Sequence, residues 1–156
     1  MTTLTSSHAS SSAPTSAFFE RWADMATWTE WNQDTEWVRL DGPFAAGSTG
    51  VLKPKGGPKV PFVIEKLTDR EFVDVSKLFG ARLTFAHTIT ERPDGGSEID
   101  VTISMTGPLR ALWMAILGKD IKAGAQADLD ALVTVAERTT DVAVAGVAVA
   151  EKDEAR

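Results

Sequence analysis

The chain has 156 residues, and 16 Lys and Arg against 22 Asp and Glu give it a formal net charge of −6. This length suits one domain whose core is large enough to fold without metals or disulfides. Because Cys is absent, a disulfide scaffold, thiol catalysis and Cys-ligated metal sites are excluded. An isoelectric point near 4.9 argues against nucleic-acid binding and against electrostatic binding to anionic membranes, since both favour a basic face.

Aromatic usage is uneven, with five Trp and seven Phe but no Tyr. Residues 1–17 lack the basic start and apolar run of a signal peptide. No segment approaches the ~18 consecutive apolar residues that span a bilayer. We therefore expect a cytoplasmic protein without membrane insertion.

The N-terminal third predicts one strand and two helical segments. Leu4–Ser10 favours a short strand, and Pro14 suits the first turn of a helix because its missing N–H costs nothing there. Apolar residues at helical spacing then predict a helix over Thr15–Met25, and Ala26–Trp31 predicts a further helical turn. The Trp residues of these segments are expected to pack beneath a sheet.

From residue 36 onward the pattern changes to strands. The predicted strands are Glu36–Leu40, Ser48–Lys53, Val60–Leu67, Glu71–Leu78, Ala81–Arg92 and Ser97–Thr106. Short Gly-, Pro- and Asp-containing breaks separate them, which indicates an antiparallel meander because parallel strands need long crossovers. A long helix opens at Gly107-Pro108 and runs to about Arg138. We expect residues 1–138 to form the single domain and residues 139–156 a helix extension or flexible tail.

The last two strands have one apolar face each. The shared faces are Leu83, Phe85, His87 and Ile89 in the first strand and Ile99, Val101, Ile103 and Met105 in the second, and His87 is the one polar residue among these eight. Parity requires an odd number of residues in the connecting loop if the two apolar faces are to coincide. A three-residue loop, residues 94–96, pairs Ile89 with Val101 and His87 with Ile103, and a five-residue loop preserves the same faces.

The long helix has two apolar sets. One steps by four and winds slowly around the axis: Trp113, Leu117, Ile121, Ala125 and Leu129, continued by Leu132 and Ala136. The other set, Leu109, Leu112 and Ile116, widens the apolar arc of the first half. We expect this second set to cover a cavity or to fill a thicker core.

The order of elements, together with a series of short motifs, resembles the helix-grip fold of the START and birch-pollen-allergen-like superfamily, also called SRPBCC. Its polyketide cyclase/dehydrase and lipid-transport branch is the most similar. The motifs are Ala13-Pro14 with Phe19 and Trp22, Ala23-Asp24, Trp28, Trp31, Gly42-Pro43, Gly47-Ser48-Thr49-Gly50, Phe85-Ala86-His87, Asp94-Gly95-Gly96, Thr106-Gly107-Pro108-Leu109 and the segment from Leu129 to Ala136-Glu137. They cover about residues 2–138.

This resemblance implies an α+β domain in which a curved antiparallel sheet of about seven strands wraps around the C-terminal helix. It also implies a deep apolar cavity between them that binds a lipid, a polyketide or a similar molecule. The expected lining is Leu83, Phe85, His87, Ile89, Ile99, Val101, Ile103, Met105, Leu109, Trp113 and Ile116. We expect no cofactor and no nucleic-acid partner, and the chain to be a monomer or a homodimer.

Assembled catalytic signatures are missing. The sequence has no phosphate-binding Gly-x-x-x-x-Gly-Lys-Ser/Thr loop, no His-Glu-x-x-His and no Gly-x-Ser-x-Gly, and with only His8 and His87 no His-rich metal site can form. His87 is the one candidate for acid–base chemistry, and a buried neutral histidine bonded to a neighbour is the competing interpretation.

Three hypotheses for function therefore stay open. The first is hydrophobic-ligand binding, with His87 and the Trp113 indole N–H as polar contacts. The second is a polyketide aromatase/cyclase or dehydratase that uses the same cavity. The third is a protein–protein interaction module of the same fold, which would need an exposed apolar patch on the outer sheet face.

Overall fold

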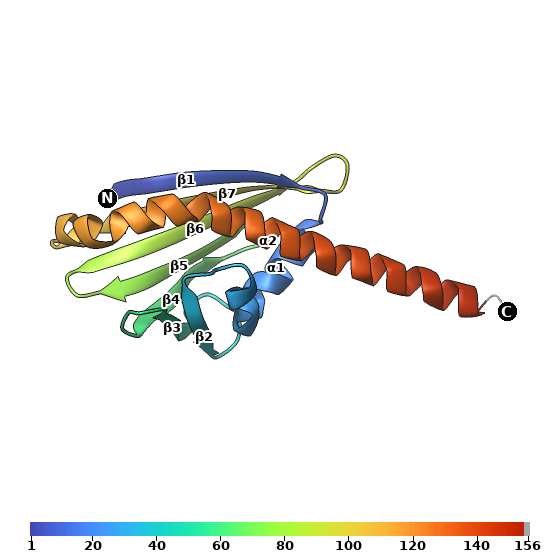
Figure 1. Ribbon diagram of the computed structural model, residues 1–156, viewed down its shortest axis with the longest axis horizontal. Coiled ribbons are helices and arrows are strands. Elements are labelled where there is room, and N and C mark those ends of the chain that lie inside the picture. The colour runs from blue at the N-terminus through green and yellow to red at the C-terminus, as the bar shows by residue number, and fades with distance from the viewer. Residues whose placement is uncertain (155–156) are drawn as a thin grey trace.

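The computed structural model describes the backbone of residues 1–154 and the side-chain environment of residues 1–141. Its centre is an antiparallel sheet with the strand order β1-β7-β6-β5-β4-β3-β2 (Figure 1). The strands are β1 (Thr2–Ser11), β2 (Thr35–Asp41), β3 (Thr49–Pro54), β4 (Val60–Leu67), β5 (Glu71–Leu78), β6 (Ala81–Glu91) and β7 (Ser97–Thr106). The meander from β2 to β7 and the return of β1 to the edge beside β7 confirm the predicted α+β architecture.

Two helical segments follow β1, as the sequence predicts. Pro14 lies directly before α1 (Thr15–Ala23), and the predicted end at Met25 is slightly late because a break at Asp24 separates α1 from the 3-10 helix η1 (Met25–Glu30). Phe18, Trp22, Met25 and Trp28 are buried. These apolar side chains therefore pack in the core, as expected.

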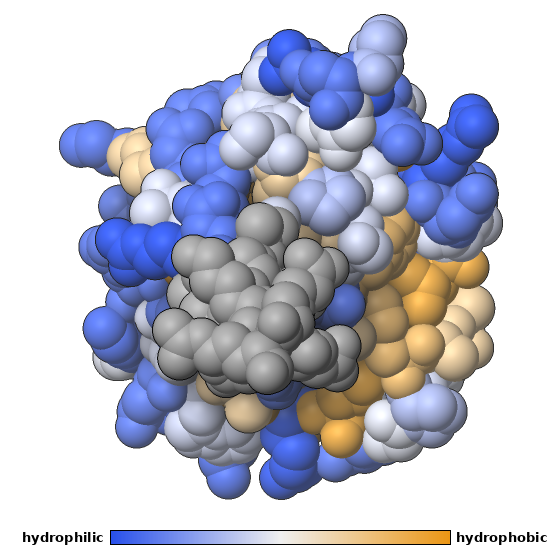
Figure 2. All heavy atoms as spheres, turned by 90° about the vertical axis from the view of Figure 1, so that its right-hand side faces the viewer, coloured by the Kyte–Doolittle hydropathy of each residue, from blue (hydrophilic) through white to orange (hydrophobic). Residues whose placement is uncertain are grey.

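The C-terminal helix α2 spans Arg110–Glu154 and continues past the predicted end near Arg138. It packs mainly along β1, more lightly on β7 and β6, and also against α1. Its C-terminal part projects beyond the sheet (Figure 1). Viewed from that end, hydrophilic side chains cover much of the surface and apolar ones gather on one side (Figure 2).

The β6–β7 register decides between the two predicted loop lengths. Glu91 pairs with Ser97, so the loop is the five-residue alternative, residues 92–96. The pairs are consequently Ile89 with Ile99 and His87 with Val101, two residues from those of a three-residue loop. A backbone bond from Arg92 N–H to the Gly96 carbonyl, at 2.8 Å, helps to hold the longer loop. Because the shift is even, the two apolar faces coincide as predicted.

The concave face of the sheet carries two hydrophobic clusters. The aromatic cluster joins α1, η1, several sheet strands and the second half of the described helix, and includes Phe18, Trp22, Trp28, Trp31, Phe62, Ile64, Phe72, Ile89, Ile99, Leu129, Leu132 and Ala136. The helix-start cluster consists of Leu4, Ala81, Leu83, Ile103 and Met105, with Leu78, Phe85, Val101, Trp113, Met114, Ile121 and Ala125 packed against it. The predicted stripe of α2 runs through both clusters, from Trp113 in one to Ala136 in the other.

Candidate functional site

The residues expected to line one cavity are divided between the two clusters. Ile89 and Ile99 are fully packed in the aromatic cluster. Leu83, Ile103 and Met105 are buried in the helix-start cluster, while Phe85, Val101 and Trp113 are half-buried against it. The predicted apolar face therefore lies on the concave side of the sheet. Other side chains of the protein pack against much of it, where the resemblance implies a cavity.

Two predictions for the start of α2 are wrong. Ile116 is 55% exposed and Leu112 is 53% exposed, so neither covers a cavity or thickens the core. The reason is helical geometry: α2 turns Trp113, Leu117 and Ile121 toward the protein, and residues 112 and 116 lie on its outer side. Leu109, in contrast, packs against Gly80 at the β5–β6 turn.

The Trp113 indole is not a free polar contact for a ligand. Its Nε1–H donates a hydrogen bond to the Phe79 carbonyl at 2.7 Å. This bond ties the first turn of α2 to the β5–β6 turn. Its role is structural, because the donor is already satisfied.

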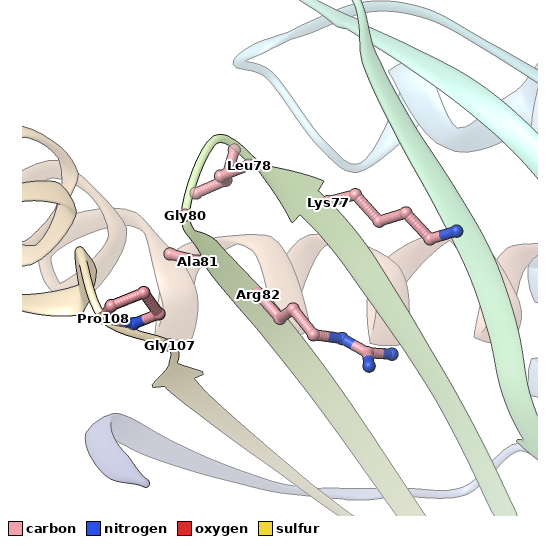
Figure 3. Close-up of a pocket in the computed structure, with 7 residues that line it drawn as sticks. All are labelled: Lys77, Leu78, Gly80, Ala81, Arg82, Gly107 and Pro108. Atoms are coloured by element: carbon pink, nitrogen blue, oxygen red, sulfur yellow. The ribbon is translucent and has the colours of Figure 1, made fainter.

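The two best-defined depressions of the described surface do not join His87, Met105 and Trp113. One, of about 420 Å³, lies between the β5–β6 turn and the β7–α2 loop, and is lined by Lys77, Leu78, Gly80, Ala81, Arg82, Gly107 and Pro108 (Figure 3). The other, of about 450 Å³, lies near the β4–β5 turn, with Arg70 and Glu91 in its lining. Both are open surface features rather than the deep cavity that the resemblance implies.

His87 is buried and bonded, which matches the competing interpretation of this residue. Its Nδ1 lies 2.9 Å from the Phe72 carbonyl oxygen, and because a carbonyl only accepts, Nδ1 carries the proton and Nε2 is left as an acceptor. The imidazole stacks on the Phe72 ring with 4.9 Å between centroids and lies 5.2 Å from Trp22. Burial lowers the pKa of His87 to about 4, so the ring is neutral at physiological pH.

A carboxyl group that sequence reasoning missed lies beside this histidine. Asp74 Oδ1 is 4.0 Å from His87 Nδ1, and both side chains are about nine-tenths buried. Among the described side chains, none forms a hydrogen bond to the Asp74 carboxyl. Burial raises the pKa of Asp74 to about 7. Ser76, also buried, is the next residue of β5 on the same face.

A register argument could have found Asp74. The β5–β6 hairpin has a two-residue turn, Phe79-Gly80, with Gly80 at φ +67°, a conformation that favours glycine. Pairing Leu78 with Ala81 across this turn places Asp74 opposite Phe85 and Phe72 opposite His87. Asp74 therefore shares the concave face with His87, although it stands in a strand that also contains Val73 and Val75.

Near Asp74 the interface between sheet and helix is incompletely closed. We call this interface the seam; its side chains are only half-buried, from the sheet Leu78, Phe85 and Val101, and from the helix Trp113, Met114 and Ile121. Asp74 pairs directly with Phe85 across the strands. The seam thus combines partly accessible apolar surface with a carboxyl group whose pKa is raised to about 7 and a neutral imidazole behind it.

The acidic residues Glu30 and Glu36, near η1, lie on the solvated surface. Glu30 and Glu36 are exposed and pair with Arg21 and Lys53. Asp128 of α2 has a pKa raised to about 6, first by burial and then by the neighbouring Asp34. Among the described residues, no group of three or more His, Asp or Glu side chains is arranged to hold a metal ion.

Comparison with known proteins identifies the fold. No family model matches the sequence, and no curated protein matches it significantly. Solved structures do match. Ara h 8.0201 has a TM-score of 0.67 at 15% identity over 86% of this chain and 97% of its own. The Zhui aromatase/cyclase from Streptomyces sp. R1128 has a TM-score of 0.66 at 14% identity over 87% and 94%. The hypothetical protein jhp0584 from Helicobacter pylori has a TM-score of 0.65 at 16% identity over 84% and 86%.

These similarities confirm the predicted fold. Ara h 8.0201 and Zhui are helix-grip proteins of the SRPBCC group, and this chain has the same seven-stranded sheet, short helices after the first strand and long C-terminal helix. At 14–15% identity the likeness establishes architecture alone. Function has to be argued from the residues of this chain.

Proposed function

We propose that the protein binds a hydrophobic small molecule, of the lipid or polyketide type, in the seam between the concave sheet face and the first half of α2. The observation that carries the proposal is the difference in closure between the two clusters. The aromatic cluster has α1 and η1 as part of its cover, whereas at the seam the partly buried apolar side chains of the sheet and of α2 have no such additional layer. Apolar surface with a few placed polar groups is the usual composition of a small-molecule site.

The polar end of such a ligand would meet Asp74. In its neutral form this carboxyl is both a donor and an acceptor, so it can bond a ligand hydroxyl or carbonyl. Burial favours that neutral form, because a charge there loses its hydration. Entry requires α2 to move relative to the sheet, and the seam is the part of this interface without the additional α1 and η1 layer.

Native mass spectrometry and displacement of a fluorescent fatty acid test the proposal. We expect the purified chain to carry or take up one hydrophobic molecule, and Phe85→Ala to weaken displacement about tenfold. The matched control is Thr84→Ala, on the same strand but the opposite face. If neither method detects a bound or displaceable hydrophobe, the proposal is wrong.

A second function, a polyketide cyclase or dehydratase, is favoured by the Asp74–His87 pair. Between about pH 4 and 7, Asp74 holds a proton to give and His87 Nε2 is free to accept one. A donor and an acceptor in one apolar site are what enolisation and loss of water require. The aromatase/cyclase activity in the name of Zhui belongs to that protein and shows only that the fold accommodates such chemistry.

The pH–rate profile on a linear poly-β-ketone mimic separates this function from simple binding. Asp74→Asn keeps the shape and removes the titration, so we expect it to abolish turnover while the mimic still binds. Asp100→Asn, on the outer face of β7, is the matched control. Turnover that persists unchanged in both Asp74→Asn and His87→Ala would rule out this mechanism.

A further inference from the structure

Large exposed apolar side chains gather at one end of the molecule. Phe79, in the β5–β6 turn, is 84% exposed, and Leu112 and Ile116 face outward from the first turns of α2. We call these three residues the apolar tip. In Figure 1 the β5–β6 turn and the start of α2 lie at the same end, opposite the projecting end of α2.

Hydrogen bonds and packing hold the two parts of the apolar tip, the β5–β6 turn and the start of α2, in fixed positions. The Trp113 indole bonds the Phe79 carbonyl, and Leu109 packs on Gly80, so the turn and the helix are fixed to one another. A further backbone bond joins Leu109 N–H to the Gly80 carbonyl at 2.9 Å. Phe79 is therefore exposed on a segment that hydrogen bonds and packing hold in place.

Several basic residues lie near the apolar tip in the chain, although the chain as a whole is acidic. Lys77, Arg110 and Lys119 are exposed, and among the described residues none of them has an ion-pair partner; Arg82 pairs with Glu65 at 3.3 Å. Lys77 and Arg82 are cross-strand neighbours on the strands that flank the turn, and their charged ends point the same way, away from the turn (Figure 3). Asp120 is the acidic residue next to Lys119 on α2. Local charge at this end is thus opposite in sign to the net charge of −6.

Apolar and basic residues together favour one kind of partner for this surface over another. A second copy of the chain would bring an identical basic border against this one, and like charges across an interface oppose association. An anionic bilayer offers the complement to both parts, with acyl chains for Phe79, Leu112 and Ile116 and headgroups for the lysines and arginines. None of the described helices is long and apolar enough to cross a membrane, so the contact is superficial.

We infer that the apolar tip and its basic border dock the protein on the surface of an anionic membrane, with the seam next to the lipid. Trp113 belongs to the seam and also contacts the β5–β6 turn, so the docking surface and the seam adjoin. A hydrophobic molecule could then pass between bilayer and protein without crossing water. The docking itself does not depend on the proposed ligand, because it uses other side chains.

Flotation of the full chain with vesicles tests the docking. We expect binding to vesicles of phosphatidylcholine with phosphatidylglycerol, little binding to phosphatidylcholine alone, and loss of binding when salt rises from about 0.1 M to about 0.5 M. The double variant Lys77→Glu, Arg110→Glu should lower partition at least about tenfold. Its matched control, Arg70→Glu with Arg138→Glu, changes the net charge equally at positions remote from the apolar tip and should lose much less.

A second pair of substitutions tests the apolar part. Phe79→Ser with Ile116→Ser should also lower partition about tenfold, with an unchanged circular dichroism spectrum because both side chains are exposed. Equal losses in the charge variant and its control, or no binding to anionic vesicles, would overturn the inference. A concentration-dependent dimer that the serine variant abolishes would overturn it as well, by assigning the surface to a second copy. Vesicle binding without displaceable hydrophobe would leave docking intact and refute only the proposed ligand.

Discussion

The two hydrophobic clusters use the same sheet face and the same helix yet differ in closure. The aromatic cluster has α1 and η1 as an additional layer, and their Trp and Phe side chains fill the space between the sheet and the second half of the described helix. The helix-start cluster has only the first half of α2 as cover, and the side chains of the seam are only partly buried. From this difference we expect substitutions in the aromatic cluster to destabilise the fold most, and we expect any opening for a ligand to occur at the helix-start cluster.

The largest expected effect is at Trp22, in the centre of the aromatic cluster. Trp22 is fully buried and its ring contacts those of Phe18, Phe19, Phe72 and His87. Removing it leaves a large cavity, so Trp22→Ala should lower the free energy of unfolding by about 3–5 kcal/mol in urea titrations. A loss below about 1 kcal/mol would show that this cluster is not the stable one.

The next effect depends on pH. The pKa of Asp74 is raised from 3.8 to about 7 in the folded state, so the folded chain holds a proton that the unfolded chain releases, and stability falls as pH rises through this window. Asp74→Asn abolishes that loss. It should stabilise the protein at pH 8 by about 2–4 kcal/mol and change little at pH 4, as measured by urea unfolding at both values.

His87 provides the opposite slope and therefore a control for Asp74. Its lowered pKa, about 4 instead of 6.5, means that the unfolded chain takes up a proton first, so stability is lost as pH falls from about 6.5 toward 4. Asp74→Asn should leave this acid limb in place. The same stability gain at pH 4 and pH 8 would contradict the assignment of a buried neutral acid.

Trp113 tests the other cluster. It is half-buried and contributes one hydrogen bond to the Phe79 carbonyl, so Trp113→Ala should cost only about 1–2 kcal/mol. Trp113→Phe, which keeps the ring and loses the donor, separates packing from bonding. Ligand displacement should respond more strongly than stability. If Trp113→Ala destabilised the chain as much as Trp22→Ala, the contrast between the clusters would fail.

The smallest effect is expected at Ile116. Its outward position on α2 predicts that Ile116→Ser changes the free energy of unfolding by less than about 0.5 kcal/mol. Thermal and urea unfolding measure this directly. Leu132→Ser, on the buried side of the same helix, is the matched comparison and should be strongly destabilising.

Periodicity and turn chemistry were enough for the elements. The observed bounds of β4, β5 and β7 are those the sequence predicts, because each strand is delimited by Gly, Pro or Asp turns and needs no distant contact to be recognised. The side of the sheet on which His87 lies also followed from parity alone. Asp74 was missed because its face depends on pairing with a neighbouring strand, which the local pattern of β5 does not reveal.

By itself, then, the sequence determined the order of strands and helices, the single domain-sized core and the scarcity of reactive groups, since these depend on composition and on contacts between near neighbours in the chain. Only the tertiary structure decided that the expected cavity is divided into two clusters, that Ile116 and Leu112 face outward, and that Asp74 joins His87. These features depend on how far α2 lies from each strand and on how it is rotated about its axis. An apolar stripe wider than one helix face leaves that rotation open, and packing against β1 resolves it.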